Sequence, residues 1–238
     1  MERYGDIVEI LREVETSIGK LQVMYEKARK DDEIKAVLRP TVKSTLEHLR
    51  SVLEYSAQDI RDFCKAENSK LYFPYGKNES LFRDNAKKNL PNLHQDSKIY
   101  HIVESLQPHC CGDEWLSTLC DQTNFNKHNA LGKQIRENSK SSTTDIGNFA
   151  RVGGNAIVTI KNSSINGISI GCNGPVVVSR QRTTAEIQRD VGENIPVARE
   201  FDWVEFKFEN TAKDTLSLIV KAHQEILTYI EKLRKELS

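Results

Sequence analysis

The sequence has no excess of charge of either sign, because its 34 Lys and Arg residues are balanced by 34 Asp and Glu residues. This balance excludes a uniformly basic nucleic-acid binder and leaves room only for a local basic patch. Long hydrophobic runs are also missing, so no segment approaches the length that a membrane span needs. The first residues lack the apolar core of a signal peptide. We therefore expect a globular cytoplasmic protein with no membrane partner.

Regularly spaced cysteines are missing as well. Adjacent Cys110 and Cys111, followed nine residues later by Cys120, do not show the paired ligand spacing of structural zinc sites. An odd number of cysteines without regular spacing favours reduced thiols. The glycines form no Gly-x-x-x-x-Gly-Lys motif for phosphate binding. The sequence thus predicts neither a metal site nor a small-molecule cofactor.

Apolar residues recur at steps of three and four in three long segments, which predicts amphipathic helices. The stripes run from Ile7 to Ala28, from Val42 to Cys64 and from Leu216 to Leu237. The short connection between the first two favours an antiparallel helix pair. We expect its facing sides to be buried, namely Leu46, Leu49, Leu53 and Ile60 against Leu11, Val14, Ile18 and Leu21.

Shorter elements are expected between the second and the last helix. Residues 68–92 look like a loop that holds an ordered aromatic turn at 72–76. Helical patterning returns at 95–106, and Asp113 is a plausible N-cap for a further helix. That helix should carry Asn124 to His128 near its C-terminal end.

From Lys133 the composition changes, and strand patterns appear at residues 156–160, 168–170, 176–178 and 203–208. Asn-Gly turn signals stand at 166–167 and 173–174, and Phe206 and Phe208 alternate with charges as buried strand residues do. The predicted fold is mainly α: a helical bundle built on a long antiparallel helix pair, with a small antiparallel β insertion before the C-terminal helix. We expect three segments: a helical bundle core at 1–132, a β-rich insertion at 133–210, and a C-terminal helix at 211–238 that returns to the bundle.

Two helical motifs carry a resemblance to a known family. They are Leu46-Glu-His-Leu-Arg-Ser-Val-Leu-Glu-Tyr55 and Asn124-Phe-Asn-Lys-His-Asn-Ala-Leu131, and Leu106-Gln-Pro108 and Trp115-Leu-Ser-Thr-Leu119 precede the second. Together they resemble helical bacterial proteins related to the HEPN superfamily (higher eukaryote and prokaryote nucleotide-binding). The resemblance covers about residues 41–131 and leaves out the β insertion.

The resemblance implies a site at His128. Ribonucleases of this superfamily act without metal, using a His for proton transfer and an Arg of the same helix for the phosphate charge. Here the positions where that Arg would stand are Asp121, Gln122 and Thr123. Because the catalytic pattern is missing, we expect no efficient RNA cleavage.

The polar residues of the two motifs have two interpretations. In the first they form a site in which Lys127 and Arg50 replace the missing Arg. In the second they form a buried network that ties two helices together, with His128 hydrogen-bonded to Glu54 or Arg50. The residues concerned are His128, Lys127, Arg50, Glu54, Asn124 and Asn126.

A modest basic cluster follows the second motif. Lys133, Arg136 and Lys140 could contact a nucleic-acid backbone. Their acidic and small neighbours, such as Glu137 and Ser139, favour an ordinary solvated loop instead.

The predicted function is a non-catalytic or weakly catalytic module that acts by binding to itself as a homodimer, to a partner protein or to RNA. The resemblance also implies a place in a bacterial defence or toxin system. One alternative is a metal-independent ribonuclease with a degenerate active site centred on His128. Another is a structural subunit that uses its β lobe for recognition.

Overall fold

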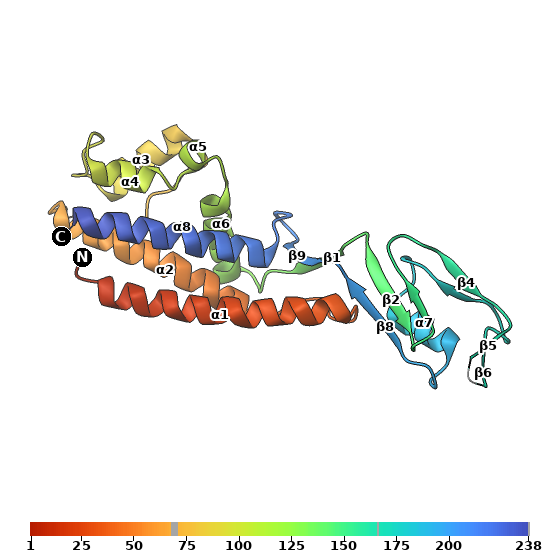
Figure 1. Ribbon diagram of the computed structural model, residues 1–238. Helices are drawn as coiled ribbons and strands as arrows, with labels where there is room; N and C mark the ends of the chain where they lie inside the picture. The colour runs from red at the N-terminus through yellow and green to blue at the C-terminus, as the bar shows by residue number, and fades with distance from the viewer. Residues whose placement is uncertain (68–70, 166, 238) are drawn as a thin grey trace. The chain divides into compact units, whose positions relative to one another are not determined.

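The computed structural model describes residues 1–67, 71–165 and 167–237. The chain is mainly helical, with a small set of antiparallel strands before the last helix, as predicted (Figure 1). It divides into two compact units. A helical unit comprises residues 1–21, 38–133 and 208–238, and a β-rich unit comprises 22–37 and 134–207. The β-rich unit thus includes a stretch of the first helix that the sequence had placed in the bundle.

Three long helices build the helical unit. They are α1 (Tyr4–Lys30), of which only the first part belongs to this unit, α2 (Arg39–Phe63) and α8 (Thr215–Glu236). The first two are antiparallel, because Arg3 beside the start of α1 pairs with Asp59 near the end of α2, with 2.8 Å between Nη1 and Oδ1. In the part of the chain that the structure describes, no helix is both long and apolar enough to cross a membrane.

The predicted helix stripes form the core of the helical unit. All eight residues expected in the helix pair are buried: Leu11, Val14, Ile18, Leu21, Leu46, Leu49, Leu53 and Ile60. The closest backbone approaches of α2 are nevertheless to α8 and to α6 (Trp115–His128), and not to α1. Buried Ser56 and Tyr229 link α2 to α8 through their hydroxyl groups, 2.9 Å apart.

Short helices connect α2 to α6. They are α3 (Glu79–Asn89), α4 (Lys98–Glu104) and α5 (Pro108–Cys111). Helix α3 corrects the loop expected over 68–92, of which residues 68–70 lie outside the described residues. It begins where the Asn78 side chain accepts a hydrogen bond of 2.9 Å from the Leu81 amide, and Phe82 anchors it in the core. Gly76 packs so tightly against it that a Cβ there would lie 2.4 Å from the Phe82 nitrogen.

Besides the last part of α1, the β-rich unit contains short antiparallel strands and one short helix within its described residues. The pairs are β1 (Gln134–Asn138) with β9 (Val204–Phe208), β2 (Ser142–Ile146) with β3 (Ala150–Val152) and β8 (Val197–Phe201), β4 (Val158–Ile160) with β7 (Val176–Val178), and β5 (Ser163–Ile165) with β6 (Ile168–Ile170). Strands β4, β6, β7 and β9 match predicted segments, whereas the others were not expected. Of the predicted 166–167 turn, Asn166 lies outside the described residues.

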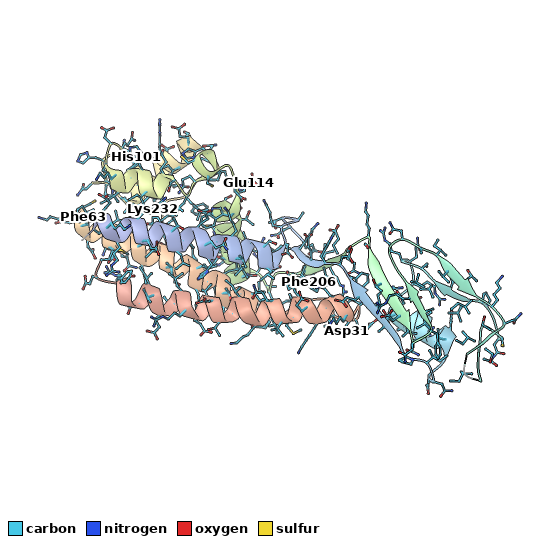
Figure 2. The ribbon with its side chains drawn as sticks, viewed as in Figure 1. Asp31, Phe63, His101, Glu114, Phe206 and Lys232 are labelled. Carbon is cyan, nitrogen blue, oxygen red and sulfur yellow. The ribbon has the colours of Figure 1, made fainter. Side chains whose placement is uncertain are left out.

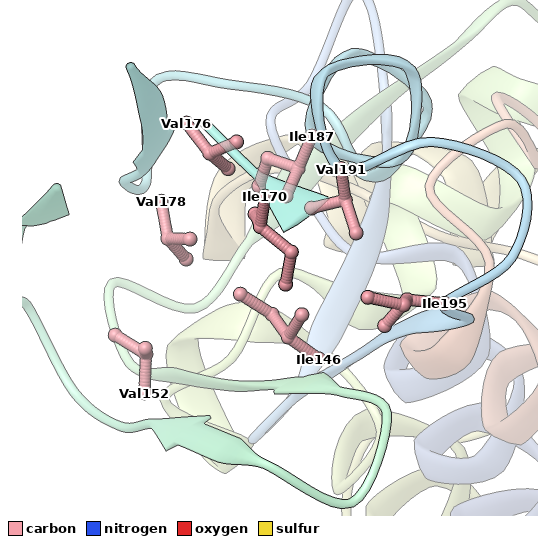
Figure 3. Packing of buried hydrophobic residues seen from close by; sticks show 8 residues of the cluster. All are labelled: Ile146, Val152, Ile170, Val176, Val178, Ile187, Val191 and Ile195. Atoms are coloured by element: carbon pink, nitrogen blue, oxygen red, sulfur yellow. The ribbon is translucent and has the colours of Figure 1, made fainter. Parts of the chain in front are cut away.

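Aliphatic side chains fill the core of this unit (Figure 3). They are Ile146, Val152, Ile170, Val176, Val178, Ile187, Val191 and Ile195. Ile187 and Val191 come from α7 (Thr184–Val191), which the sequence analysis did not predict. This helix begins with a capping box in which Thr183 and Glu186 bond each other's backbone amides.

A buried arginine completes the β-rich unit. Arg199 of β8 donates to the Thr144 hydroxyl at 3.0 Å, to the Ser179 carbonyl at 3.0 Å and to the Arg182 carbonyl. Its guanidinium thereby satisfies carbonyl groups of the segment between β7 and α7.

Candidate functional site

A cleft of about 890 Å³ opens in the helical unit where α2 and α6 meet α3 and the aromatic segment, residues 72–76. We call it the α2–α6 cleft. Four of the residues singled out in the sequence line it: Arg50, Asn124, Lys127 and His128. A smaller depression of about 400 Å³ shares three of them and adds Glu54. The structure therefore brings the two motifs together around a surface opening.

Arg50 lies largely buried beneath the cleft and is committed to internal partners. Its Nη2 is 2.6 Å from Glu54 Oε1, its Nη1 donates to Cys120 Sγ, and its guanidinium lies 5.1 Å from the centre of the Tyr75 ring. Burial raises the pKa of Cys120 to about 12, so this thiol is uncharged near neutral pH. Glu54 therefore balances the charge of Arg50, which presents little of it to a ligand.

Two predicted binding residues hold the backbone instead. Glu54 accepts a hydrogen bond of 2.6 Å from the Phe73 amide and so ties the aromatic segment to α2. Buried Asn126 accepts one of 2.9 Å from the Gly132 amide, which fixes the chain after α6. Arg50 and Glu54 belong to one polar network. Within the described residues, no contact links this network to Asn126 or to His128.

His128 does not make the hydrogen bond to Glu54 or Arg50 that we expected. It is exposed in the last turn of α6, and none of the described residues is recorded as its hydrogen-bond partner. The reason is its position on the helix, because α6 turns Thr123 and Asn126 inward and leaves Lys127 and His128 in solvent. A histidine without an orienting partner is poorly prepared for proton transfer.

The aromatic segment forms one wall of the cleft and is held along its length. Its amides at Tyr72 and Gly76 donate to Asn89 and Gln107, each at 3.1 Å, and its Tyr75 carbonyl accepts from Asn85 at 2.8 Å. The Tyr72 side chain is 61% exposed. Sequence reasoning identified only an ordered turn here, since nothing in the pattern showed that it faces α6.

The charges around the cleft are mainly positive. Lys77, Lys88 and Lys127 line it, and Asp121 is paired with Lys77 at 3.2 Å. For Lys88 and Lys127, which are both exposed, no ion pair is recorded among the described residues. These two ammonium groups give the opening a positive potential, which favours an anionic ligand.

The basic cluster expected after the second motif does not form a free cationic patch. Arg136 donates to the carbonyls of Ala28, Asp31 and Ile34 at 2.6–2.7 Å and so caps the C-terminal end of α1. Lys133 lies 4.0 Å from a carboxylate oxygen of Glu209. The Arg136 guanidinium is therefore engaged within the β-rich unit, and its role as a binding residue stays a prediction.

Comparison of the chain with protein-family models, curated proteins and solved structures found no match. The HEPN resemblance therefore stays a prediction.

Proposed function

We propose that the α2–α6 cleft binds a short single-stranded segment of RNA and does not cleave it efficiently. The observation that carries the proposal is the joint exposure of Tyr72, Lys88, Lys127 and His128 in one opening. Proteins hold single strands by stacking bases on aromatic rings and by placing cations along the phosphates. The Tyr72 ring can stack on a base, and the ammonium groups of Lys88 and Lys127 can lie beside the flanking phosphates.

Further groups suit the same ligand. Asn124 is exposed in the cleft, and its amide offers both donors and an acceptor for a base edge. Its contact with Tyr75 holds it beside the wall. His128 adds a further hydrogen-bonding group at the rim.

Weak or absent catalysis follows from the state of the two catalytic candidates. RNA cleavage requires a positioned base for the 2′-hydroxyl and a cation at the scissile phosphate. Among the described residues, His128 has no recorded orienting partner, and Arg50 is engaged by Glu54 and Cys120. The ribonuclease remains the second candidate, because His128 and Lys127 are adjacent, exposed and directed to one opening.

The HEPN resemblance adds two proposals that the site itself does not address. We propose a homodimer that forms through helices near the polar site, and a role in a bacterial defence or toxin system. Sedimentation at micromolar concentration tests the first, and a monomer there contradicts it.

Binding is tested with a fluorescently labelled oligonucleotide of mixed sequence, titrated with the full chain and followed by anisotropy. Tyr72→Ala should weaken binding by about 5- to 150-fold, since one base stack contributes roughly 1–3 kcal/mol. Lys127→Ala should weaken it for every sequence and reduce its salt dependence. The matched controls are Lys87→Ala and Phe63→Ala, exposed residues that do not line the cleft.

Two results contradict the proposal: no binding by the wild type at low salt, or equal losses in the control variants. The same RNA is then incubated with the wild type and with His128→Ala. Cleavage that disappears in a His128→Ala variant of unchanged melting temperature decides for the ribonuclease.

A further inference from the structure

A second cluster of reactive side chains lies on α4 and α5, apart from the α2–α6 cleft. Glu104 ends α4, and His109 and Cys110 lie on α5. One carboxylate oxygen, one ring nitrogen and the thiol sulfur of these three residues lie within 4.8 Å of one another. None of them lines the α2–α6 cleft.

The spacing of the donor atoms suits a metal ion. Two ligands of one tetrahedral zinc ion are about 3.3–3.5 Å apart, given zinc–nitrogen and zinc–oxygen bonds of about 2.0–2.2 Å. His109 Nε2 and Glu104 Oε1 are 3.5 Å apart. The pair thus already stands at the separation that zinc would impose, and the Cys110 sulfur lies within 4.8 Å of both donors.

The surroundings hold two of these donors in place. The His109 and Glu104 side chains are only 20% and 17% exposed. The His109 ring packs beside Phe82, with 5.8 Å between the ring centres. His101 approaches the second oxygen of Glu104 with its Nδ1 at 3.4 Å (His101 is labelled in Figure 2). A neighbour of this kind orients a ligating carboxylate.

We propose that Glu104, His109 and Cys110 bind a divalent zinc ion, with the fourth position open to water or to His101. Histidine, thiolate and carboxylate are all ligands of zinc. Because the ligands come from both helices, the ion would link α4 to α5. The sequence analysis predicted no zinc because the cysteines lack paired spacing, whereas this set combines Glu104 at the end of α4 with the adjacent His-Cys pair of α5. The proposal is independent of RNA binding.

Cobalt(II) tests the site, because it enters zinc sites and its absorption reports a thiolate ligand. The full chain, reduced and stripped with a chelator, should bind one cobalt ion with a thiolate-to-cobalt charge-transfer band, and zinc should displace it. Cys110→Ser should remove the band. The matched control Cys111→Ser, which changes the neighbouring exposed thiol, should retain it. His109→Ala and Glu104→Gln should weaken binding at least about tenfold, since even the loss of an outer-shell partner costs that much.

A stability readout complements the spectra. Zinc should raise the melting temperature of the wild type and of Tyr72→Ala, but not that of Cys110→Ser. Failure of the wild type to bind cobalt or zinc overturns the proposal. So does loss of the band in Cys111→Ser, or unchanged affinity in both His109→Ala and Cys110→Ser. A Tyr72→Ala variant that loses RNA and keeps the metal shows that the two sites are separate.

Discussion

The two units satisfy the hydrogen-bonding groups of their buried backbone in different ways. In the helical unit, long helices satisfy their own amides and carbonyls, so large apolar side chains such as Leu49 and Trp115 fill the core. In the β-rich unit, carbonyls of a connecting segment and of the end of α1 need other donors, and Arg199 and Arg136 supply them. The first unit therefore depends on packed volume, and the second depends also on charge-assisted hydrogen bonds.

Removing volume from the helical unit should have the largest effect. Leu49→Ala empties a fully buried position on α2 and should lower the free energy of unfolding by about 2–5 kcal/mol. Equilibrium urea denaturation followed by circular dichroism measures the change. Leu227→Ala on α8, where the leucine is 37% exposed, is the control and should cost much less. Equal costs for the two variants contradict the assignment of the core.

Removing hydrogen bonds from the β-rich unit should have a smaller and local effect. Arg199→Leu removes the hydrogen bonds to Thr144, Ser179 and Arg182, and the loss of a buried partner of this kind costs about 1–3 kcal/mol. Hydrogen exchange should accelerate in residues 134–207 and stay nearly unchanged in α2. Arg151→Ala, which removes an exposed arginine, should leave both regions unchanged. Faster exchange throughout the chain would erase the contrast between the units.

The smallest expected effect is a pH dependence within the helical unit. Half-buried His223 of α8 lies beside Glu15 and the backbone of Leu11, and burial lowers its pKa. The unfolded chain then binds the proton more readily than the folded one, so stability is full above the unfolded value of about 6.5 and falls below it. His223→Gln should show a shallower loss of stability between about pH 7 and 5. Identical pH profiles for both proteins exclude this role.

The sequence was sufficient to predict an element wherever apolar residues repeat with one regular spacing. The eight residues expected between α1 and α2 are buried, and Phe206 and Phe208 are buried in β9. In α8 the stripe was only partly correct, because Leu216, Val220 and Leu237 are half-buried. Helix α3 was missed because its single large anchor, Phe82, gives no stripe. Helix α7 was missed although Thr183 and Glu186 spell a capping box. Strands β1 and β2 are mainly polar and lack the continuous apolar run that marks β7.

The candidate site was predictable only in part. The two motifs do place Arg50, Lys127 and His128 at one opening. The pattern could not show which side chains are already hydrogen-bonded within the protein. Glu54, for example, accepts a hydrogen bond from the Phe73 amide of the aromatic segment. Nor could it place Lys88, which reaches the cleft only because the unpredicted α3 carries it there.

The hydrogen bonds along the aromatic segment bear on how fast and how selectively a ligand could associate. A wall that is already fixed by Glu54, Asn89 and Gln107 loses little conformational entropy when a ring of Tyr72 is covered. Association would then be limited by encounter and steering rather than by the closing of a loop. The fixed backbone at Tyr72 would favour strands that can present a base there without bending, whereas the flexible lysine side chains can follow phosphates at several distances.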